Sequence, residues 1–271
     1  MIELRDIHKK FNAGTVNEVY ALRGVSLTIA QGQFVTVIGT NGSGKSTLLS
    51  MMAGTVLPDS GTVTVAGRDV TKKRDFERAR FVARVFQNPF MGTAPDMSIA
   101  ENLLVAYLRG KRHYPKIGLT RERLDFFKSR IGELEMQLEE RLETIIGSLS
   151  GGQRQAVSLL MATIREPKVL LLDEHTAALD PKSASQIIRL TKTFIERGKL
   201  LTSIMVTHSM QQALDLGDRL IMMHQGKIID DIPQKDKERL TVDDLLNKFG
   251  DLRKTEKLTD EIMEQLKREY L

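Results

Sequence analysis

The chain has 271 residues, of which 41% are hydrophobic and 28% charged, with a formal net charge of +5. This length suffices for one sizeable domain or two small ones, and because charges of both signs are spread along the chain, the surplus indicates a solvated surface rather than a nucleic-acid partner. The absence of cysteine excludes disulfides, thiolate metal sites and a cysteine nucleophile. No run approaches the roughly 20 apolar residues that span a bilayer, and the amino terminus is too charged for a signal peptide. We therefore expect a soluble, cytoplasmic chain.

The amino-terminal part is predicted to be rich in strands. Alternating and β-branched runs, Gly32 between two of them, favour an antiparallel sheet that leads into a central strand ending at Gly39. A helix is predicted to begin near Lys45, and a turn at residues 58–61 follows it. The predicted strands of this part are residues 2–7, 25–29, 34–39, 62–67 and 80–86.

From about Ile99 to Ala162 the pattern is helical, with a loop at residues 109–118, and it predicts a helical subdomain inserted between strands. Short apolar strands then alternate with helices, which argues for a parallel sheet covered on both faces. The later elements are strands at 168–173, 201–208, 219–225 and 227–232, a helix from Pro181 to about Arg197, a short helix before 219, and amphipathic helices at 241–249 and 258–270.

Residues 39–46, GTNGSGKS, match the phosphate-binding loop pattern and stand where its chemistry requires, after a strand and at the start of a helix. Glycines let backbone N–H groups face phosphate oxygens, the helix amino terminus favours an anion, and Lys45 adds a point charge. Ser46 is positioned to bind Mg²⁺ and Thr47 to reach the α-phosphate. The predicted nucleotide-binding residues of this loop are Gly39, Thr40, Asn41, Gly42, Ser43, Gly44, Lys45, Ser46 and Thr47.

Two carboxylates, Asp173 and Glu174, follow the apolar run at residues 169–172. Ligands of open α/β sheets bind at the carboxyl ends of the strands. We therefore expect Asp173 to hold Mg²⁺ and Glu174 to orient and deprotonate a water molecule. Asp180 before Pro181 also fits ordinary helix capping.

Two further polar residues end predicted strands. His208 follows the strand at 201–208, where we expect a contact with the γ-phosphate. Gln87 follows the strand at 80–86, and its amide could reach the metal or the water.

The stretch LSGGQ, residues 149–153, places two glycines at a helix entrance, each of which costs about 1 kcal/mol against alanine inside a helix. Ser150, Gly151 and Gly152 would leave the amino terminus of this helix open to an anion. Side chains larger than glycine there would block close approach.

In their order, GTNGSGKS, Gln87, LSGGQ, VLLLDE and His208 resemble the nucleotide-binding subunit of an ABC (ATP-binding cassette) transporter, over residues 2 to about 232. The resemblance implies an α/β fold: a P-loop NTPase (RecA-like) core with an antiparallel β subdomain and an inserted helical subdomain at about 88–162. Because the composition turns polar after Pro233, we predict an ATPase domain at 1–240 and a short helical tail at 241–271. We expect the tail beyond Thr241 to be a plain terminal helix, and the alternative is that it packs on a second copy or a regulator.

The resemblance also implies a homodimer with two sandwiched ATP molecules. Residues Ser150 to Gln153 of one copy would close over the ATP held by the phosphate loop of the other. Catalytic roles would fall to Glu174, His208 and Gln87, and Mg²⁺ would bind Ser46, Gln87 and Asp173. An aromatic ring stacked on adenine would be Phe11 or, less favoured, Tyr20. The chain departs from the family at Phe11, where tyrosine is usual, and at His175, where proline is usual.

The implied activity is Mg²⁺-dependent ATP hydrolysis that drives a separate membrane permease, on the cytoplasmic face of the membrane. DEHTAALD, residues 173–180, resembles ATPases of bacterial uptake systems assigned to aromatic amino acids, which implies an importer with a substrate-binding protein. The first alternative is an ABC-type ATPase outside transport, but the chain shows neither a long coiled coil nor tandem cassettes. A GTPase would need an NKxD-type motif, and NKFG at 247–250 lacks the aspartate. A noncatalytic ATP binder would have lost Glu174 or His208, and both are present.

Overall fold

The computed structural model describes residues 1–110, 118–198 and 200–256, the last six of these by backbone alone. They divide into two compact units, Met1–Lys72 with Ile204–Leu271, and Lys73–Ser203. Most of the predicted loop at 109–118 and the predicted helix at 258–270 lie outside the described residues.

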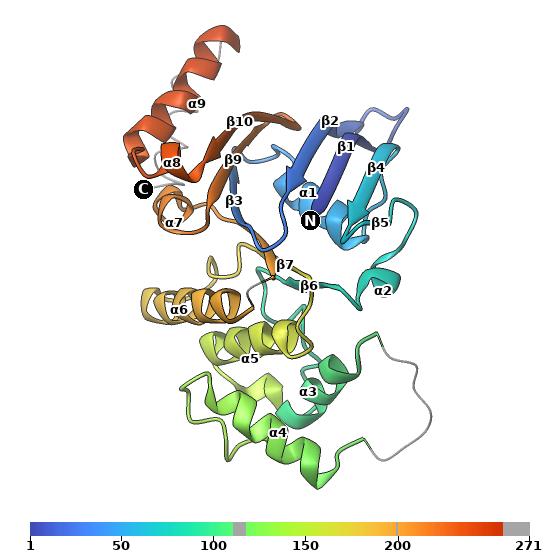
Figure 1. Cartoon of the computed structure of the whole chain (residues 1–271), viewed down its shortest axis with the longest axis vertical. Coiled ribbons are helices and arrows are strands. Elements are labelled where there is room, and N and C mark those ends of the chain that lie inside the picture. The colour runs from blue at the N-terminus through green and yellow to red at the C-terminus, as the bar shows by residue number, and fades with distance from the viewer. Residues whose placement is uncertain (111–117, 199, 257–271) are drawn as a thin grey trace. The chain divides into compact units, whose positions relative to one another are not determined.

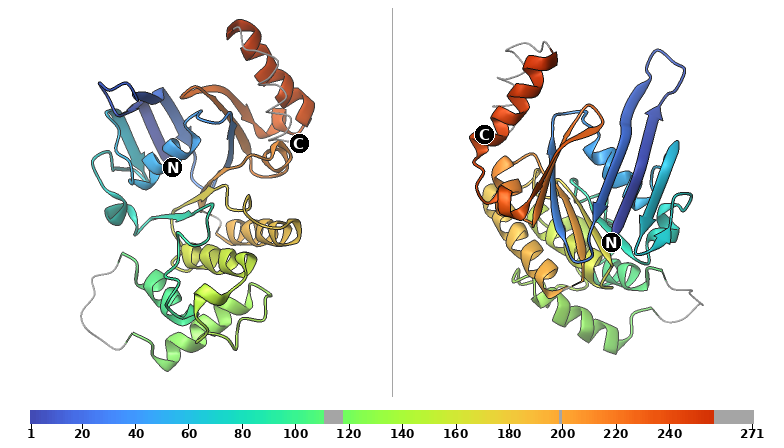
Figure 2. Two further views of the ribbon diagram at one scale, coloured as in Figure 1. Left: turned by 180° about the vertical axis from the view of Figure 1, so that it is seen from behind. Right: turned by 45° about the horizontal axis from the view of Figure 1, so that its top comes forward.

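A four-stranded antiparallel sheet forms one part of the first unit, in the order β2-β1-β4-β5 (Figure 2). The predicted antiparallel sheet is therefore confirmed, although its first two strands extend beyond the predicted runs. They lengthen because β1 and β2 pair along most of their length, from Ile2 opposite Ile29 to Phe11 opposite Val19. The four strands are β1 (Ile2–Phe11), β2 (Val19–Ile29), β4 (Ser60–Val65) and β5 (Arg68–Asp69).

The buried strand β3 (Phe34–Gly39) lies parallel to β9 (Arg219–His224), and β10 (Lys227–Pro233) pairs antiparallel to β9 (Figure 1). All six residues of β3 are buried, as expected for a central strand of an α/β fold. Helix α1 (Lys45–Ala53) contacts β2, β3 and β4. Two short helices complete this part, α7 (Met210–Asp215) and α8 (Gln234–Lys237).

Helix α9 (Val242–Glu256) belongs to the core of the first unit over its first two turns. Leu245, Leu246 and Phe249 are buried in a cluster that includes Ile38 of β3 and Met210 of α7. The sequence predicts a plain terminal helix beyond Thr241, and the apolar face of its first two turns packs on this core. Apolar side chains at i, i+1 and i+4 form one stripe, which the sheet removes from water.

Replacing Phe249 with alanine should lower the free energy of unfolding by about 3–5 kcal/mol, because a fully buried ring would leave a cavity. Asn247→Ala on the exposed side of the same helix is the control and should change it by less than about 0.5 kcal/mol. Chemical denaturation of both variants measures the difference. Equal stabilities would show that α9 contributes nothing to the core.

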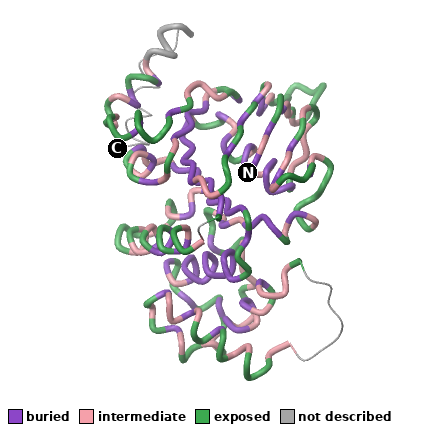
Figure 3. Tube along the Cα trace, viewed as in Figure 1, coloured by how far each residue is buried: buried purple, intermediate pink, exposed green. Residues whose placement is uncertain are grey.

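The second unit holds a parallel strand pair and most of the helices. Helix α5 is nearly all buried (Figure 3), and because it packs against β6, α3, α4 and α6, the compact unit is larger than the predicted helical insert at 88–162. Strand β8 (Thr202–Val206) lies on the division between the units. The elements of this unit are β6 (Val82–Val85), β7 (Val169–Asp173), α2 (Asp75–Arg78), α3 (Ile99–Leu108), α4 (Arg121–Gly132), the 3₁₀ turn Ile146–Ser148, α5 (Gly151–Thr163) and α6 (Pro181–Arg197).

Within residues 1–110, 118–198 and 200–256, no helix is long and apolar enough to cross a membrane.

Candidate active site

The phosphate loop joins β3 to α1 in the first unit. Gly44 has φ 96° and ends the loop in the left-handed region, and no side chain caps the helix that follows. The amino-terminal amides of α1 are therefore available for an anion. Gly39 must be glycine for a packing reason, because a Cβ there would lie 2.3 Å from the Met223 carbonyl oxygen.

Lys45 is buried at the start of α1, and its amine forms hydrogen bonds with the backbone of the phosphate loop. Nζ donates to the carbonyl oxygens of Gly39 at 2.6 Å and of Thr40 at 3.2 Å. Both carbonyl acceptors hold the amine at the phosphate loop, and a lysine amine is the point charge that such a loop places near phosphate oxygens.

The turn between β9 and β10 supports the phosphate loop from one side. The Gly226 amide donates to the Ser43 carbonyl oxygen at 3.0 Å, and His224 Nδ1 lies 3.0 Å from the Thr40 hydroxyl. Sequence reasoning missed His224, although its place at the end of a strand matched the signal used for His208.

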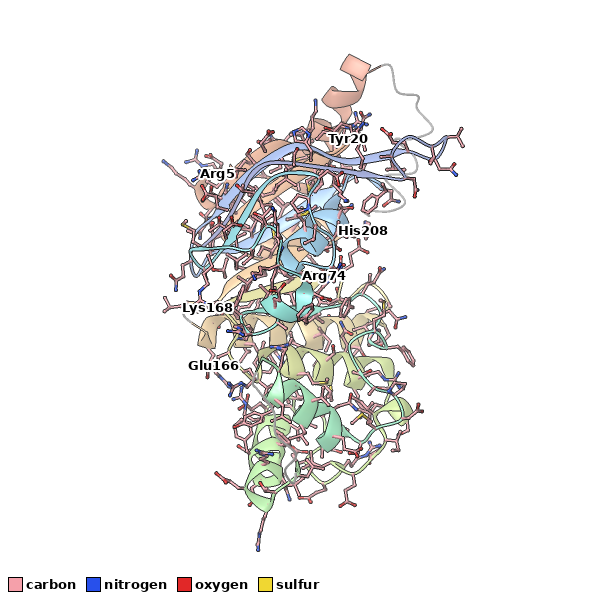
Figure 4. The ribbon with its side chains drawn as sticks, turned by 90° about the vertical axis from the view of Figure 1, so that its right-hand side faces the viewer. Arg5, Tyr20, Arg74, Glu166, Lys168 and His208 are labelled. Carbon is pink, nitrogen blue, oxygen red and sulfur yellow. The ribbon has the colours of Figure 1, made fainter. Side chains whose placement is uncertain are left out.

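His208 lies two residues beyond β8, beside the strand that leads into the phosphate loop (labelled in Figure 4). The Thr207 amide donates to the Val37 carbonyl oxygen at 3.2 Å, which aligns this end of β8 with the end of β3. The first unit therefore brings His208 to the carboxyl end of β3, where the loop begins.

The two candidate aromatic rings differ in their surroundings. Lys10 Nζ lies 5.0 Å and the Arg23 guanidinium 5.2 Å from the centre of the Tyr20 ring, and the Tyr20 hydroxyl is hydrogen-bonded to His8. Phe11 is half-buried, with Lys9 Nζ 5.6 Å from its ring centre. Because two cations and a hydrogen bond already engage Tyr20, the geometry favours Phe11 for stacking on a base.

Asp173 ends β7 in the second unit, and Arg84 of β6 holds its carboxylate. The guanidinium Nη2 donates to Asp173 Oδ2 at 2.5 Å, with both side chains largely buried. Burial strengthens such a charge-assisted contact, since water screens it less. Sequence reasoning missed Arg84; an arginine inside the apolar run RFVARVF was the available signal.

Glu174 has a backbone φ of 45°, in the left-handed region that non-glycine residues rarely adopt. Its neighbour His175 is buried, and this burial lowers the pKa of the imidazole to about 4, so it is neutral at physiological pH. Gln87 is exposed, two residues beyond β6. Since β6 and β7 are parallel and in register from Val82–Val169 to Val85–Leu172, the carboxyl ends that precede Gln87 and Glu174 lie side by side.

The amino terminus of α5, which we call the signature helix (Gly151–Thr163), is closed by a capping box. The Gln153 amide donates to the Ser150 hydroxyl and the Ser150 amide donates to Gln153 Oε1, both at 3.2 Å. The box does not use the amides of Gly151 and Gly152, and the Ser150 hydroxyl keeps its proton for donation. An anion could therefore still bind at this terminus.

The two glycines of the signature helix have different reasons to be glycine. A Cβ at Gly152 would lie 2.6 Å from the Ser183 hydroxyl oxygen, so α6 excludes a side chain there. A Cβ at Gly151 would make only an ordinary 3.7 Å contact with Leu179. We predicted that both glycines keep the path of an anion open; packing alone already requires Gly152.

Asp180 caps α6, with its carboxylate accepting from the Ser183 amide at 3.0 Å and Pro181 in the first turn. Hydrogen bonds from Ser183, first from its hydroxyl and then from its amide, lower the pKa of the Asp180 carboxyl. Asp180 is therefore a helix cap, as its position before Pro181 indicates.

Candidate Mg²⁺ ligands are all oxygen donors, as this ion requires: the Ser46 hydroxyl, the Asp173 carboxylate and the Gln87 amide oxygen. Within the described ranges, no three His, Asp or Glu side chains gather into a metal site. Mg²⁺ at a nucleotide needs only one or two protein oxygens, because phosphates and water complete its shell. The oxygen chemistry of each candidate residue suits such an ion.

A family model described as ABC transporter matches residues 22–177, more than half of the chain. The chain belongs to the ABC transporter ATP-binding family. The expected resemblance and the P-loop NTPase fold are thereby confirmed, and the chain is an ATPase that uses ATP and Mg²⁺.

The curated relatives of this ABC ATPase are transport proteins. A tyrosine transport ATP-binding protein of Clostridioides difficile is 41% identical over 92% of this chain and 98% of its own length. An sn-glycerol-3-phosphate import ATP-binding protein of Rhizobium meliloti is 37% identical over 84% of this chain but only 60% of its own length.

Solved structures of ATP-binding cassettes share the fold. One is a dimeric post-hydrolysis state bound to ADP and Pi, with a TM-score of 0.74 and 27% identity over 86% of this chain and 99% of that chain. Relatives of this ABC ATPase thus form dimers, and the family pairs with transport permeases.

Proposed function

We propose that this ABC ATPase forms a homodimer around two ATP molecules and powers uptake of an aromatic amino acid, with tyrosine as the first candidate. The permease and a substrate-binding protein would be separate chains, and the ATPase would act on the cytoplasmic face of the membrane. The observation that carries the proposal is the match to a tyrosine transport ATP-binding protein over nearly the full length of both chains. The sn-glycerol-3-phosphate and spermidine/putrescine import relatives match this chain over only 60% and 57% of their own lengths.

We assign the binding of the triphosphate to the first unit. Lys45 and the amides of the phosphate loop would hold the phosphates, Phe11 would stack on adenine, and His208 would contact the γ-phosphate. Ser46 would be one ligand of Mg²⁺, which when bound neutralises charge on the phosphate oxygens. The support is the amino terminus of α1, which no side chain caps, and the position of the Lys45 amine at the loop.

We assign the chemistry to the second unit. Glu174 would accept the proton of the attacking water, while Asp173 and Gln87 would contribute oxygen atoms for the metal. Residues 150–153 of one copy would bind the γ-phosphate held by the other. The support is the left-handed backbone of Glu174 and the parallel strands that end before Glu174 and Gln87.

Uptake of labelled amino acids by cells tests the substrate. A strain without this ATPase should lose tyrosine uptake and recover it on expression of the chain, while leucine uptake is unchanged. Normal tyrosine uptake in the deleted strain would contradict the proposed substrate. The membrane protein that co-purifies with the chain identifies the permease.

Coupling to the permease is assigned to a surface that we call the coupling surface, residues 88–108. Three of its apolar side chains are well exposed: Phe90 at 57%, Met91 at 69% and Val105 at 59%. Arg154 of the signature helix places its guanidinium 3.8 Å from the centre of the Phe90 ring. Exposed apolar side chains such as these are available for contact with a protein partner.

Phe90→Asp should abolish complex formation with the permease and uptake in cells while leaving ATP affinity nearly intact. The fold should survive, because Phe90 is exposed and the new carboxylate would face Arg154. Phe76→Asp is the matched control: Phe76 is 72% exposed on α2, outside the coupling surface, and its substitution should preserve uptake. Normal transport by a folded Phe90→Asp variant would place the coupling surface elsewhere.

A further inference from the structure

One side-chain amide in the second unit joins the signature helix to both loops that carry catalytic candidates. Gln155 is fully buried on this helix, and its Nε2 donates to the carbonyl oxygens of Phe86 at 3.1 Å and of His175 at 2.8 Å. Phe86 immediately precedes Gln87, and His175 immediately follows Glu174. The two carbonyl acceptors also determine which end of the amide is nitrogen. A shift of the signature helix would therefore also move the loop that carries Gln87 and the loop that carries Glu174.

The side chain of His175 ties the Glu174 loop to a second helix. Its Nε2 lies 3.0 Å from the hydroxyl oxygen of Thr191 on α6, and that hydroxyl donates its proton to the Ile187 carbonyl oxygen at 2.8 Å. The hydroxyl can then only accept from the imidazole, so the N–H of His175 is on Nε2. The buried ring is anchored to α6 by a directed hydrogen bond.

These contacts lie around the backbone of Glu174, whose left-handed conformation needs support from its surroundings. A residue other than glycine in the left-handed region costs of order 1–3 kcal/mol and persists only when its surroundings determine it. Glu174, at φ 45°, is constrained on its carboxyl side by Gln155 and Thr191 through His175, and by the Ala177 amide, which donates to its carbonyl oxygen at 3.0 Å. Proline would stiffen this position through its ring; here a side-chain anchor does so.

We propose that Gln155 and the His175–Thr191 pair are positioning residues that orient Glu174 and Gln87 and transmit to them the occupation of their own signature helix by the partner's ATP. The transmission part rests on the homodimer proposed above. Ser150 and Gln155 are about 7.5 Å apart along a rigid helix that rises 1.5 Å per residue. Binding at one ATP site therefore changes the geometry of the other, and the two sites hydrolyse cooperatively.

Steady-state ATP hydrolysis by the full-length chain tests the positioning roles. Gln155→Met keeps the shape of the side chain but removes both donors, and we expect kcat to fall about tenfold to a hundredfold with little change in ATP affinity, as misplaced groups do. The Hill coefficient for ATP should lie between 1 and 2 in the original protein and fall to 1 in this variant.

Threonine variants on α6 separate positioning from folding. Thr191→Val should lower kcat severalfold, and Thr191→Ser, which restores the hydroxyl, should recover it. Thr193→Val is the matched control, because Thr193 makes the same kind of hydroxyl bond, to the Arg189 carbonyl oxygen at 3.1 Å, on the exposed face of α6. Its kcat should equal that of the original protein.

Each outcome decides a separate part of the proposal. Unchanged kcat in both Gln155→Met and Thr191→Val would overturn the positioning roles. A reduced kcat with an unchanged Hill coefficient above 1 would overturn the transmission to the second site. Sedimentation with ATP tests the homodimer itself, so its failure is distinguishable from failure of the positioning residues.

Discussion

Glu174→Gln should lower the steady-state rate of ATP hydrolysis by about 10²–10⁴-fold, the usual contribution of a general base, while ATP binding is retained. Glutamine has nearly the same shape as glutamate but cannot accept the proton of the attacking water. The phosphate contacts come from the loop at residues 39–47 and are unaffected. Hydrolysis by liberated phosphate and ATP affinity by equilibrium binding measure the two effects separately.

Glu166→Gln is the matched control for this experiment. Glu166 is exposed in the second unit and also has a left-handed backbone, with φ 46°, but it lies before β7 rather than after it. Its substitution removes a carboxylate from a similar backbone, so hydrolysis should not change. An undiminished rate in Glu174→Gln would contradict the assignment of Glu174 as the base.

Glu174→Gln should also convert from monomer to dimer when Mg²⁺ and ATP are added, because the nucleotide persists and supplies the anion that the signature helix binds. A ligand stabilises the closed form only through its higher affinity for that form, and two ATP molecules at one interface act together. Sedimentation velocity with and without ATP measures the change. A monomer in both conditions at high protein concentration would contradict the sandwiched dimer.

Gly151→Val in the Glu174→Gln background should prevent this dimer without unfolding the chain. A Cβ at position 151 makes only an ordinary 3.7 Å contact within the unit. In the proposed dimer, a side chain there would stand in the approach of the partner's phosphate. Gly152 is unsuitable for this test because its Cβ would collide with Ser183. A full ATP-dependent dimer in the double variant would show that the approach does not pass Gly151.

The order of helices and strands could be read from the sequence because hydrophobic period and turn residues act over a few positions. The start of α1 at Lys45, the span Pro181–Arg197 of α6 and the end of β7 at Asp173 agree with the pattern. Strand ends were less accurate: β1 and β2 run further because pairing with a neighbour, not local composition, determines where a strand stops.

The candidate site also has one part that the sequence predicts and another part that only the folded structure shows. By itself the sequence determined the phosphate loop, the LSGGQ helix entrance and the Asp173–Glu174 pair, because each is a contiguous motif whose chemistry depends on backbone and side chains a few residues apart. Only the tertiary structure decided that Arg84 holds Asp173, 89 positions away, and that Gln155 reaches Phe86 and His175, 69 and 20 positions away. It also decided that Phe249 belongs to a core and that Ser183 requires Gly152. Such partners are distant along the chain and meet only when strands pair and helices pack, which no local pattern of residues encodes.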